Sequence, residues 1–197
     1  MDLGWYSGVE AHPQADTLIF NGALTYFANY QAMAYFLERI YPLIRAECPQ
    51  VRLAITGRTE GVALAALRAD ESVTFTGYLS DIRPLVAGSS VCIAPLLEGG
   101  GTRLKILEAM ALGTPVVATS KGTEGLGATH GEHLLIADDP AEFARHTIAL
   151  LKDAELRARL AVQARAFVQA RYDWEPIGRQ FTALVERVVE RQGAKDD

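Results

Sequence analysis

The segment 99–108 joins a glycine run to charged residues at a spacing that suits the binding of an anion. Gly99, Gly100 and Gly101 bring no side chains to the approach of a helix that the sequence places at Thr102–Leu112, and glycine lets the backbone turn sharply there. The amino end of a helix carries unpaired N–H groups and the positive end of the helix dipole, so a phosphate group can bind to it. An ordinary glycine turn is the alternative, and the order of strand, glycines and helix favours a phosphate site.

Two cations and one acid accompany this helix start. Arg103 and Lys105 place positive charge in the first turn, where the helix dipole disfavours a cation by about 0.3–1 kcal/mol unless an anion compensates for it. Glu108 follows on the same helix and can reach a group in the same cleft, although a solvated helix residue is an equal alternative. We therefore expect an anion near Thr102, with Arg103 and Lys105 beside it.

Short apolar runs alternate with longer helical patterns around this segment. Strands are expected at Leu18–Phe20, Val51–Thr56, Val73–Phe75, Ser90–Ala94, Pro115–Ala118 and Leu134–Ile136. Helices are expected at Tyr26–Ala46, with a kink or an early end near Pro42, and at Gly61–Ala69, Asp81–Val86 and Thr102–Leu112. This alternation predicts an α/β fold, a Rossmann-like parallel sheet with helices on both faces. Clefts in such sheets form beyond the carboxyl ends of the strands.

The last part of the chain is helical throughout. Asp139, Asp153 and Asp173 can each begin a helix. At the first of them, Asp139 is the expected N-cap, Pro140 takes the first helical position and Glu142 completes a capping box. Three helices in a row predict an appendage rather than another layer of the sheet. The last helix directs its apolar residues toward something apolar: Trp174, Ile177, Phe181, Leu184, Val185 and Val188.

These patterns divide the chain into three parts. Residues 1–17 are polar and turn-prone, as in an interdomain linker, and residues 18–152 form the Rossmann-like domain. Residues 153–197 form the C-terminal helices.

Composition narrows the class of protein. A formal net charge of −5 argues against nucleic-acid binding, which needs a basic surface. Cys48 and Cys92 lack the spacing of metal ligands, so we expect a reduced, cytoplasmic protein in which both cysteines pack in the core. His130 and His133 have no recognisable third ligand, so they are expected to be solvated loop residues and no metal site is expected.

The stretch Glu98-Gly-Gly-Gly-Thr-Arg-Leu-Lys-Ile-Leu-Glu-Ala-Met-Ala-Leu-Gly-Thr-Pro-Val-Val-Ala-Thr resembles the donor-site signature of the group-1 (family 4) retaining glycosyltransferases of GT-B fold. The resemblance extends over nearly the whole chain. It includes Met1–Tyr6 as the linker, Leu18–Gly22 as the first strand and its glycine loop, Ala54–Arg58 as the second strand and its loop, Phe75–Asp81 as the nucleobase segment, and Tyr172–Glu175 as the start of the final helix. The chain thus resembles the C-terminal, donor-binding domain of that family.

The resemblance implies a nucleotide-sugar substrate, transfer with retention of configuration, no cofactor and no obligatory metal. It also implies an N-terminal acceptor domain, toward which the helices of residues 153–197 would cross back. Any peripheral membrane association would arise through that domain. Without that domain the chain is expected to bind nucleotide and to turn over nothing.

The same resemblance gives roles to single residues. Glu108 matches the second glutamate of the family's paired motif, which binds the donor ribose. The family's spacing places the first glutamate at Gly100, whereas the available acid is Glu98. Either a shifted loop lets Glu98 contact the transferred sugar and assist catalysis, or this branch does without that carboxylate. The remaining donor-binding positions are Gly22, Arg58, Tyr78, Leu79, Gly99, Gly100, Gly101, Thr102, Arg103 and Leu104.

The chain departs from the family where the diphosphate is usually held. Many relatives place an Arg and a Lys just after the first strand, whereas Ala23–Asn29 contains no cation. We expect Arg103, Lys105 and Arg58 to supply the missing charge, with Arg103 and Lys105 acting in catalysis. A surface role for Arg58 and a core position for Tyr78 remain open.

Two other functions are compatible with parts of the pattern. A non-catalytic nucleotide-binding or regulatory module would share the same phosphate site. A Rossmann oxidoreductase is disfavoured, because the glycine run follows a late strand and no Gly-x-Gly-x-x-Gly pattern is present.

Overall fold

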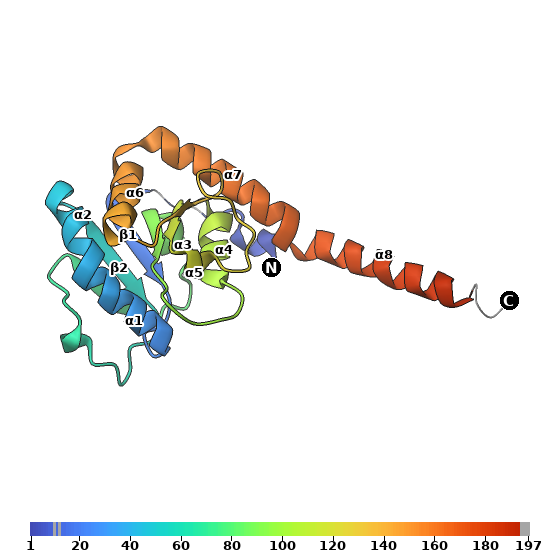
Figure 1. Cartoon of the computed structure of the whole chain (residues 1–197), viewed down its shortest axis with the longest axis horizontal. Helices are drawn as coiled ribbons and strands as arrows, with labels where there is room; N and C mark the ends of the chain where they lie inside the picture. Colours follow the sequence, from blue (N-terminus) through green and yellow to red (C-terminus); the bar gives the residue numbers. More distant parts are fainter. Residues whose placement is uncertain (10, 12, 194–197) are drawn as a thin grey trace.

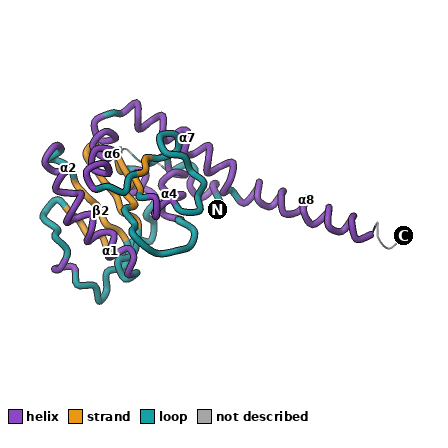
Figure 2. Tube along the Cα trace, viewed as in Figure 1, coloured by secondary structure: helices purple, strands orange, loops and turns teal. Residues whose placement is uncertain are grey.

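A six-stranded parallel sheet forms the centre of the computed structural model (Figure 1, Figure 2). The structure describes residues 1–9, 11 and 13–193, with side chains as far as residue 187. The strands are β1 (Gln14–Asn21), β2 (Arg52–Thr56), β3 (Val73–Gly77), β4 (Ser89–Ala94), β5 (Val116–Ala118) and β6 (Leu135–Ile136). The helices are η1 (Leu3–Tyr6), α1 (Phe27–Tyr35), η2 (Phe36–Ile40), α2 (Tyr41–Glu47), η3 (Leu64–Ala66), α3 (Arg83–Ala87), α4 (Leu104–Leu112), α5 (Ser120–Thr123), α6 (Pro140–Lys152), α7 (Ala154–Tyr172) and α8 (Trp174–Gly193).

The strand order is β3-β2-β1-β4-β5-β6, so the direction in which successive strands are added to the sheet changes between β1 and β4. Leu18 of β1 is opposite Leu53 of β2 on one side and Val91 of β4 on the other. Strands β2 and β3 lie on one side of β1, and the chain then crosses over to add β4, β5 and β6 on the other side. Ligands of such sheets bind beyond the carboxyl ends of the two strands at this switch point.

Alternate residues of the strands supply two separate cores. Leu18 and Phe20 pack on the face that α1, η2, α2 and α6 cover, and Ile19 packs on the face that α3 and α4 cover. Cys48 is buried in the first core and Cys92 in the second, which confirms their expected packing. The expected α/β fold with helices on both faces is confirmed.

The long helix after β1 accommodates Pro42 by a change of hydrogen bonding. Phe36–Ile40, which end two residues before the proline, form a π-helical segment, and the helix then continues to Glu47. Proline has no N–H to donate and its ring crowds the preceding turn, so a wider turn relieves the conflict. The expected irregularity near Pro42 is present, but the helix does not end there.

Two expectations about element boundaries are wrong. Gly61–Ala69 is not a helix, and only the short turn Leu64–Ala66 is helical. Leu67 is buried in the first core, and Val62 and Leu64 pack against it from this mostly irregular segment, so tertiary packing overrides the local helix propensity. Strand β1 begins at Gln14, whose N–H donates to the carbonyl oxygen of Gly88 at 2.8 Å, so the end of the expected linker 1–17 belongs to the sheet. Residues 10 and 12 of that linker lie outside the described residues.

The three C-terminal helices are not all an appendage. Helix α6 packs on β1, β4 and β5, so it is a layer of the domain, and α7 packs on α4. Helix α8 extends away from the rest of the molecule (Figure 1). Trp174 and Phe181 on α8 are 64% and 66% exposed, and Leu184 and Val185 are exposed as well. No described part of the chain covers these apolar side chains, whereas the side chain of Val188 and residues 194–197 lie outside the described part.

Among the helices of the described residues, none has the length and apolar character that crossing a bilayer requires.

Replacement of Phe143 by alanine tests the packing of α6 on the sheet. Phe143 is fully buried, and its ring meets that of Phe36 edge-on with 6.0 Å between ring centroids. We expect Phe143→Ala to lower the free energy of unfolding by about 3–5 kcal/mol, because it leaves a cavity in the first core. Urea denaturation followed by circular dichroism measures the change.

Val162→Ala on α7 serves as the control, because Val162 is 70% exposed and a surface substitution changes stability by only about 0.5 kcal/mol. Equal effects of the two substitutions would show that α6 is not packed as the structure describes.

Candidate functional site

Two adjoining cavities lie at the carboxyl ends of the strands, and Asn21 and Glu108 line both. The first, of about 330 Å³, is bounded by the loops after β1, β2 and β3, and we call it the nucleoside-end cavity. The second, of about 270 Å³, is bounded by the glycine loop and the start of α4, and we call it the phosphate-end cavity. Together they form one cleft at the switch point between β1 and β4.

The residues of the glycine loop and helix start surround the phosphate-end cavity. Gly100, Thr102 and Leu104 line it together with Arg103 and Lys105. Helix α4 begins at Leu104 rather than Thr102 and has no side-chain cap. Within the described residues, no hydrogen bond occupies the amides of Thr102 and Arg103. The expected open helix start therefore faces a cavity.

Arg103 lines the phosphate-end cavity, but its guanidinium is hydrogen-bonded to the surrounding loops. Its guanidinium donates to the carbonyl oxygens of Gly99 at 3.0 Å, Gly100 at 3.3 Å and Lys121 at 3.0 Å, and Glu124 lies 3.6 Å away. Only 6% of Arg103 is exposed. Three carbonyl acceptors use most of the donors of one guanidinium. Arg103 thus shapes the glycine loop, a role that its position in the sequence did not indicate.

Lys105 is the cation that reaches the cleft floor. Its Nζ donates to Asn29 Oδ1 at 2.5 Å and lies 4.1 Å from the centroid of the Phe20 ring. Burial disfavours the charged ammonium and lowers the pKa of Lys105 to about 8. Asn29 is held in turn, because its Nδ2 donates to the carbonyl oxygen of Ala23 at 2.8 Å.

Gly22 allows this close approach. A Cβ on residue 22 would lie 2.8 Å from the Nζ of Lys105 and 2.9 Å from Nδ2 of Asn29, so any side chain there would displace the ammonium. The cation that the sequence lacks after β1 is therefore supplied in space by α4. Sequence reasoning missed Asn29, since an asparagine in an apolar helix gave no sign of its distant partner.

Glu108 is fixed by two donors from different parts of the chain. The hydroxyl of Tyr6 donates to Oε1 at 3.1 Å, and Nδ2 of Asn21 donates to Oε2 at 3.2 Å. Burial raises the pKa of Glu108, and the two hydrogen bonds oppose that rise. Burial and the nearby carboxylate raise the pKa of Tyr6 to about 12, so its hydroxyl remains a donor at neutral pH. Glu108 is thus a cleft residue and not a solvated one.

The nucleoside-end cavity contains the aromatic residue that the sequence singled out. Tyr78 and Leu79 both line it, as does Gly22. Tyr78 is 66% exposed, which excludes a core position. The Arg58 guanidinium lies over the Tyr78 ring, 5.8 Å from its centroid. Arg58 itself is not among the residues that line either cavity, and its contact with Tyr78 associates it with the nucleoside end.

Glu98 lies at the other end of the cleft. It is exposed and lines the phosphate-end cavity together with Gly100. Gly99 and Gly101 have φ values of +95° and +85°, which glycine adopts without strain and which bend the loop around this end.

The histidines belong to a separate loop and are not both solvated, contrary to expectation. Nδ1 of His130 accepts from the amide of Ile136, and Nδ1 of His133 accepts from that of Thr129, both at 2.9 Å. The His133 ring packs on Phe167 at 4.4 Å between centroids. Among residues 1–9, 11 and 13–193, no group of three or more His, Cys, Asp or Glu side chains is placed to hold a metal ion.

Comparison with known proteins agrees with the fold. Residues 15–153 match the family model of the group 1 glycosyl transferases, which covers more than half of the chain. The chain therefore belongs to the group 1 glycosyltransferases.

Individual relatives support this membership. An uncharacterized 44.6 kDa protein in the cps region of Klebsiella pneumoniae is 31% identical over 79% of this chain and 42% of its own length. A phosphatidyl-myo-inositol mannosyltransferase of Mycobacterium leprae is 34% identical over 73% of this chain and 40% of its own length. The chain thus spans less than half the length of these relatives. The structure of Anabaena HepE in complex with UDP and glucose has the same fold, with a TM-score of 0.73 and 19% identity over 94% of this chain and 55% of that one.

Substitution of Lys105 tests whether its ammonium is buried. The pKa of Lys105, about 8, lies below its ordinary value of 10.5, so the folded chain binds fewer protons than the unfolded chain between these values. The free energy of unfolding should therefore rise as the pH increases from 8 to 10.5. Methionine fills a similar volume without charge, so Lys105→Met should remove this rise and be no less stable than the parent at pH 7.

Chemical denaturation at pH 7 and pH 9.5 measures both effects. Lys152→Met is the control, since Lys152 is more than half exposed. An unchanged pH dependence in Lys105→Met would contradict the buried position of the ammonium.

Proposed function

We propose that this chain is the nucleotide-sugar donor-binding domain of a retaining glycosyltransferase. The observation that carries the proposal is the Lys105 ammonium, which lies in the same cleft as the open amides of α4 and the Glu108 carboxylate. A cation, a helix start and a carboxylate acceptor are the groups that a nucleoside diphosphate needs. Membership in the family and the position of the cleft at the switch point support this assignment.

The donor would lie along the cleft from one cavity to the other. The diphosphate binds beside Lys105 and the amides of Thr102 and Arg103, in the phosphate-end cavity. The ribose hydroxyls donate to Glu108, which lines both cavities. The nucleobase occupies the nucleoside-end cavity near Tyr78. The transferred sugar then faces Glu98.

Charge stabilisation of the leaving diphosphate is the catalytic contribution of this domain. As the bond from sugar to phosphate breaks, negative charge grows on the diphosphate. The Lys105 ammonium and the positive end of the α4 dipole are already in place to stabilise it, which lowers the barrier without reorganisation. Arg103 contributes by keeping the glycine loop open around the departing group. No cofactor and no metal ion is required by this arrangement.

The acceptor would bind to a further domain. The relatives are more than twice as long as their matched regions, and α8 presents an apolar face that no described residue covers. We place an N-terminal acceptor domain against that face. The chain alone therefore binds nucleotide but transfers no sugar. We also propose a cytoplasmic location.

Two nucleotide sugars with different bases, GDP-mannose and UDP-glucose, appear among the similar proteins. One relative, from Corynebacterium glutamicum, is named as a GDP-mannose-dependent mannosyltransferase, and Anabaena HepE is seen with UDP-glucose. Both donors share the ribose and diphosphate that Glu108 and Lys105 would hold.

Calorimetric titration with UDP, GDP and ADP tests the proposal. We expect at least one of them to bind the parent chain. Lys105→Ala should weaken that binding by about tenfold or more, as for the loss of a charge-assisted hydrogen bond to phosphate. Lys152→Ala removes an exposed lysine instead and should leave affinity unchanged.

Absence of nucleotide binding by the folded parent chain would overturn the proposed function. Binding that Lys105→Ala does not weaken would remove the role of Lys105 and leave the cleft without its proposed cation.

A further inference from the structure

The turn η1, Leu3–Tyr6, forms one wall of the nucleoside-end cavity. Trp5 and Tyr6 both line this cavity, and none of the four residues of the turn is buried. Trp5 is 59% exposed. A tryptophan that leaves most of its ring in solvent loses the stabilisation that burial would give, and exposed aromatic side chains around a cavity are typical of ligand sites.

Arg83 holds this turn in place. Its Nε and Nη2 donate to the two carboxylate oxygens of Asp81 at 2.8 and 2.7 Å, and its Nη1 donates to the carbonyl oxygen of Trp5. The guanidinium also lies over the indole, 3.8 Å from the ring centroid. A bidentate pair fixes the guanidinium plane, and that plane in turn supports one face of the indole. Trp5 is therefore a positioned residue and not a loose one.

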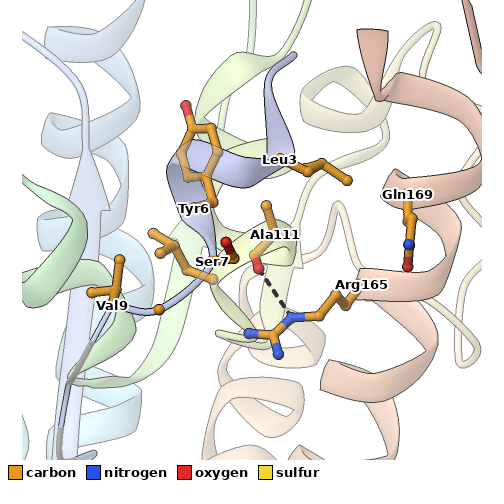
Figure 3. A pocket seen from close by; sticks show the side chains of 9 residues that line it. Leu3, Tyr6, Ser7, Val9, Ala111, Arg165 and Gln169 are labelled. Atoms are coloured by element: carbon orange, nitrogen blue, oxygen red, sulfur yellow. Dashed lines mark hydrogen bonds between the residues drawn. The ribbon is translucent and has the colours of Figure 1, made fainter. Parts of the chain in front are cut away.

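Tyr6 leaves the same turn toward the cleft. Figure 3 shows its ring projecting from the turn away from Arg165 and Gln169, which line a separate cavity of about 340 Å³ on the other side. There the Nε of Arg165 donates to the carbonyl oxygen of Ala111 at 3.0 Å. The turn thus lies between two cavities. Tyr6 lines both of them, and its hydroxyl donates to Glu108 on the side of the nucleoside-end cavity.

The bonds to Glu108 leave room for a ligand. A carboxylate accepts about four hydrogen bonds, and Tyr6 and Asn21 supply one to each oxygen. Each carboxylate oxygen of Glu108 can therefore accept one further hydrogen bond, and the Tyr6 and Asn21 donors fix the orientation of the carboxylate plane. Two neighbouring hydroxyls of a ribose have the spacing to use both.

We propose that Trp5 and Tyr6 form the nucleoside-recognition wall of this domain. Trp5 packs against the nucleobase, opposite the other exposed aromatic of the cavity, Tyr78. Tyr6 orients the Glu108 carboxylate toward the ribose, and Arg83 positions the whole turn. The proposal rests on the proposed function, because it names the residues that would read the nucleoside of the same donor.

Fluorescence of a single tryptophan reports on this wall. Trp5 and Trp174 are the two tryptophans of the chain, so Trp174→Phe leaves only Trp5. The ligands are UDP, GDP and inorganic pyrophosphate, which carries the diphosphate charge without a nucleoside. We expect a nucleoside diphosphate to change the Trp5 emission and pyrophosphate to leave it unchanged.

Affinities separate the nucleoside contact from the phosphate contact. Trp5→Ala should weaken nucleoside diphosphate binding about tenfold, as for the loss of one stacked aromatic, and leave the Kd for pyrophosphate unchanged. Trp5→Phe should restore most of the loss. Arg83→Met should weaken the nucleoside diphosphate alone, since it frees the turn without touching the phosphate-end cavity. Trp174→Ala, which removes an equally exposed tryptophan outside the cleft, is the matched control and should change neither.

The outcomes distinguish this inference from the function on which it rests. Unchanged nucleoside diphosphate affinity in Trp5→Ala and Arg83→Met, with binding by the parent intact, overturns the wall and keeps the proposed function. Equal weakening of pyrophosphate also overturns it, because the variants would then act through the fold. Failure of every ligand to bind the parent chain overturns both.

Discussion

The burial of one ammonium group determines what the cleft can bind. The Lys105 charge lies beneath the ends of β1 and α1, where lost hydration lowers its pKa to about 8. The Asn29 amide and the face of Phe20 replace only part of that hydration. A bound anion would restore the favourable interaction and shift the lysine toward its charged form. The position of Lys105 therefore favours an anionic ligand, which we propose to be the diphosphate, and reflects a compromise between stability and binding that functional sites often show.

The two cations of the glycine-loop segment act on different parts of this site. Arg103 has a planar group with several donors, and it satisfies the carbonyl oxygens of Gly99, Gly100 and Lys121. Lys105 has a compact charge on a flexible stem, and it crosses the cleft to Asn29. The arginine keeps the loop in shape while the lysine provides the charge. This division also leaves the first amides of α4 open to a ligand.

Local patterns in the sequence predicted the sheet and the cleft that contains the candidate site, and long-range contacts explain what they missed. Short apolar runs of three to six residues are visible in the local sequence, so all six strands were expected. The expected start of β1 was too late, because Gln14 and its neighbours are polar. The glycine run and Glu108 stand in one short segment and could be found together. Asn29 and Tyr6 could not, since they meet Lys105 and Glu108 across 76 and 102 residues of chain. The helix expected at Gly61–Ala69 is wrong for a related reason. Val62, Leu64 and Leu67 pack on the distant first core from a mostly irregular segment, and such contacts override local helix propensity.

Titration of the Lys105 ammonium by nitrogen-detected NMR of a lysine-labelled chain tests the account most directly. The signal is assigned by its loss in Lys105→Arg, and it is followed with and without saturating nucleoside diphosphate. The account predicts a pKa near 8 in the free chain and a higher pKa in the complex, because adjacent phosphate favours the charged form. An ordinary lysine pKa in the free chain, or one that the nucleotide leaves unchanged, would contradict it.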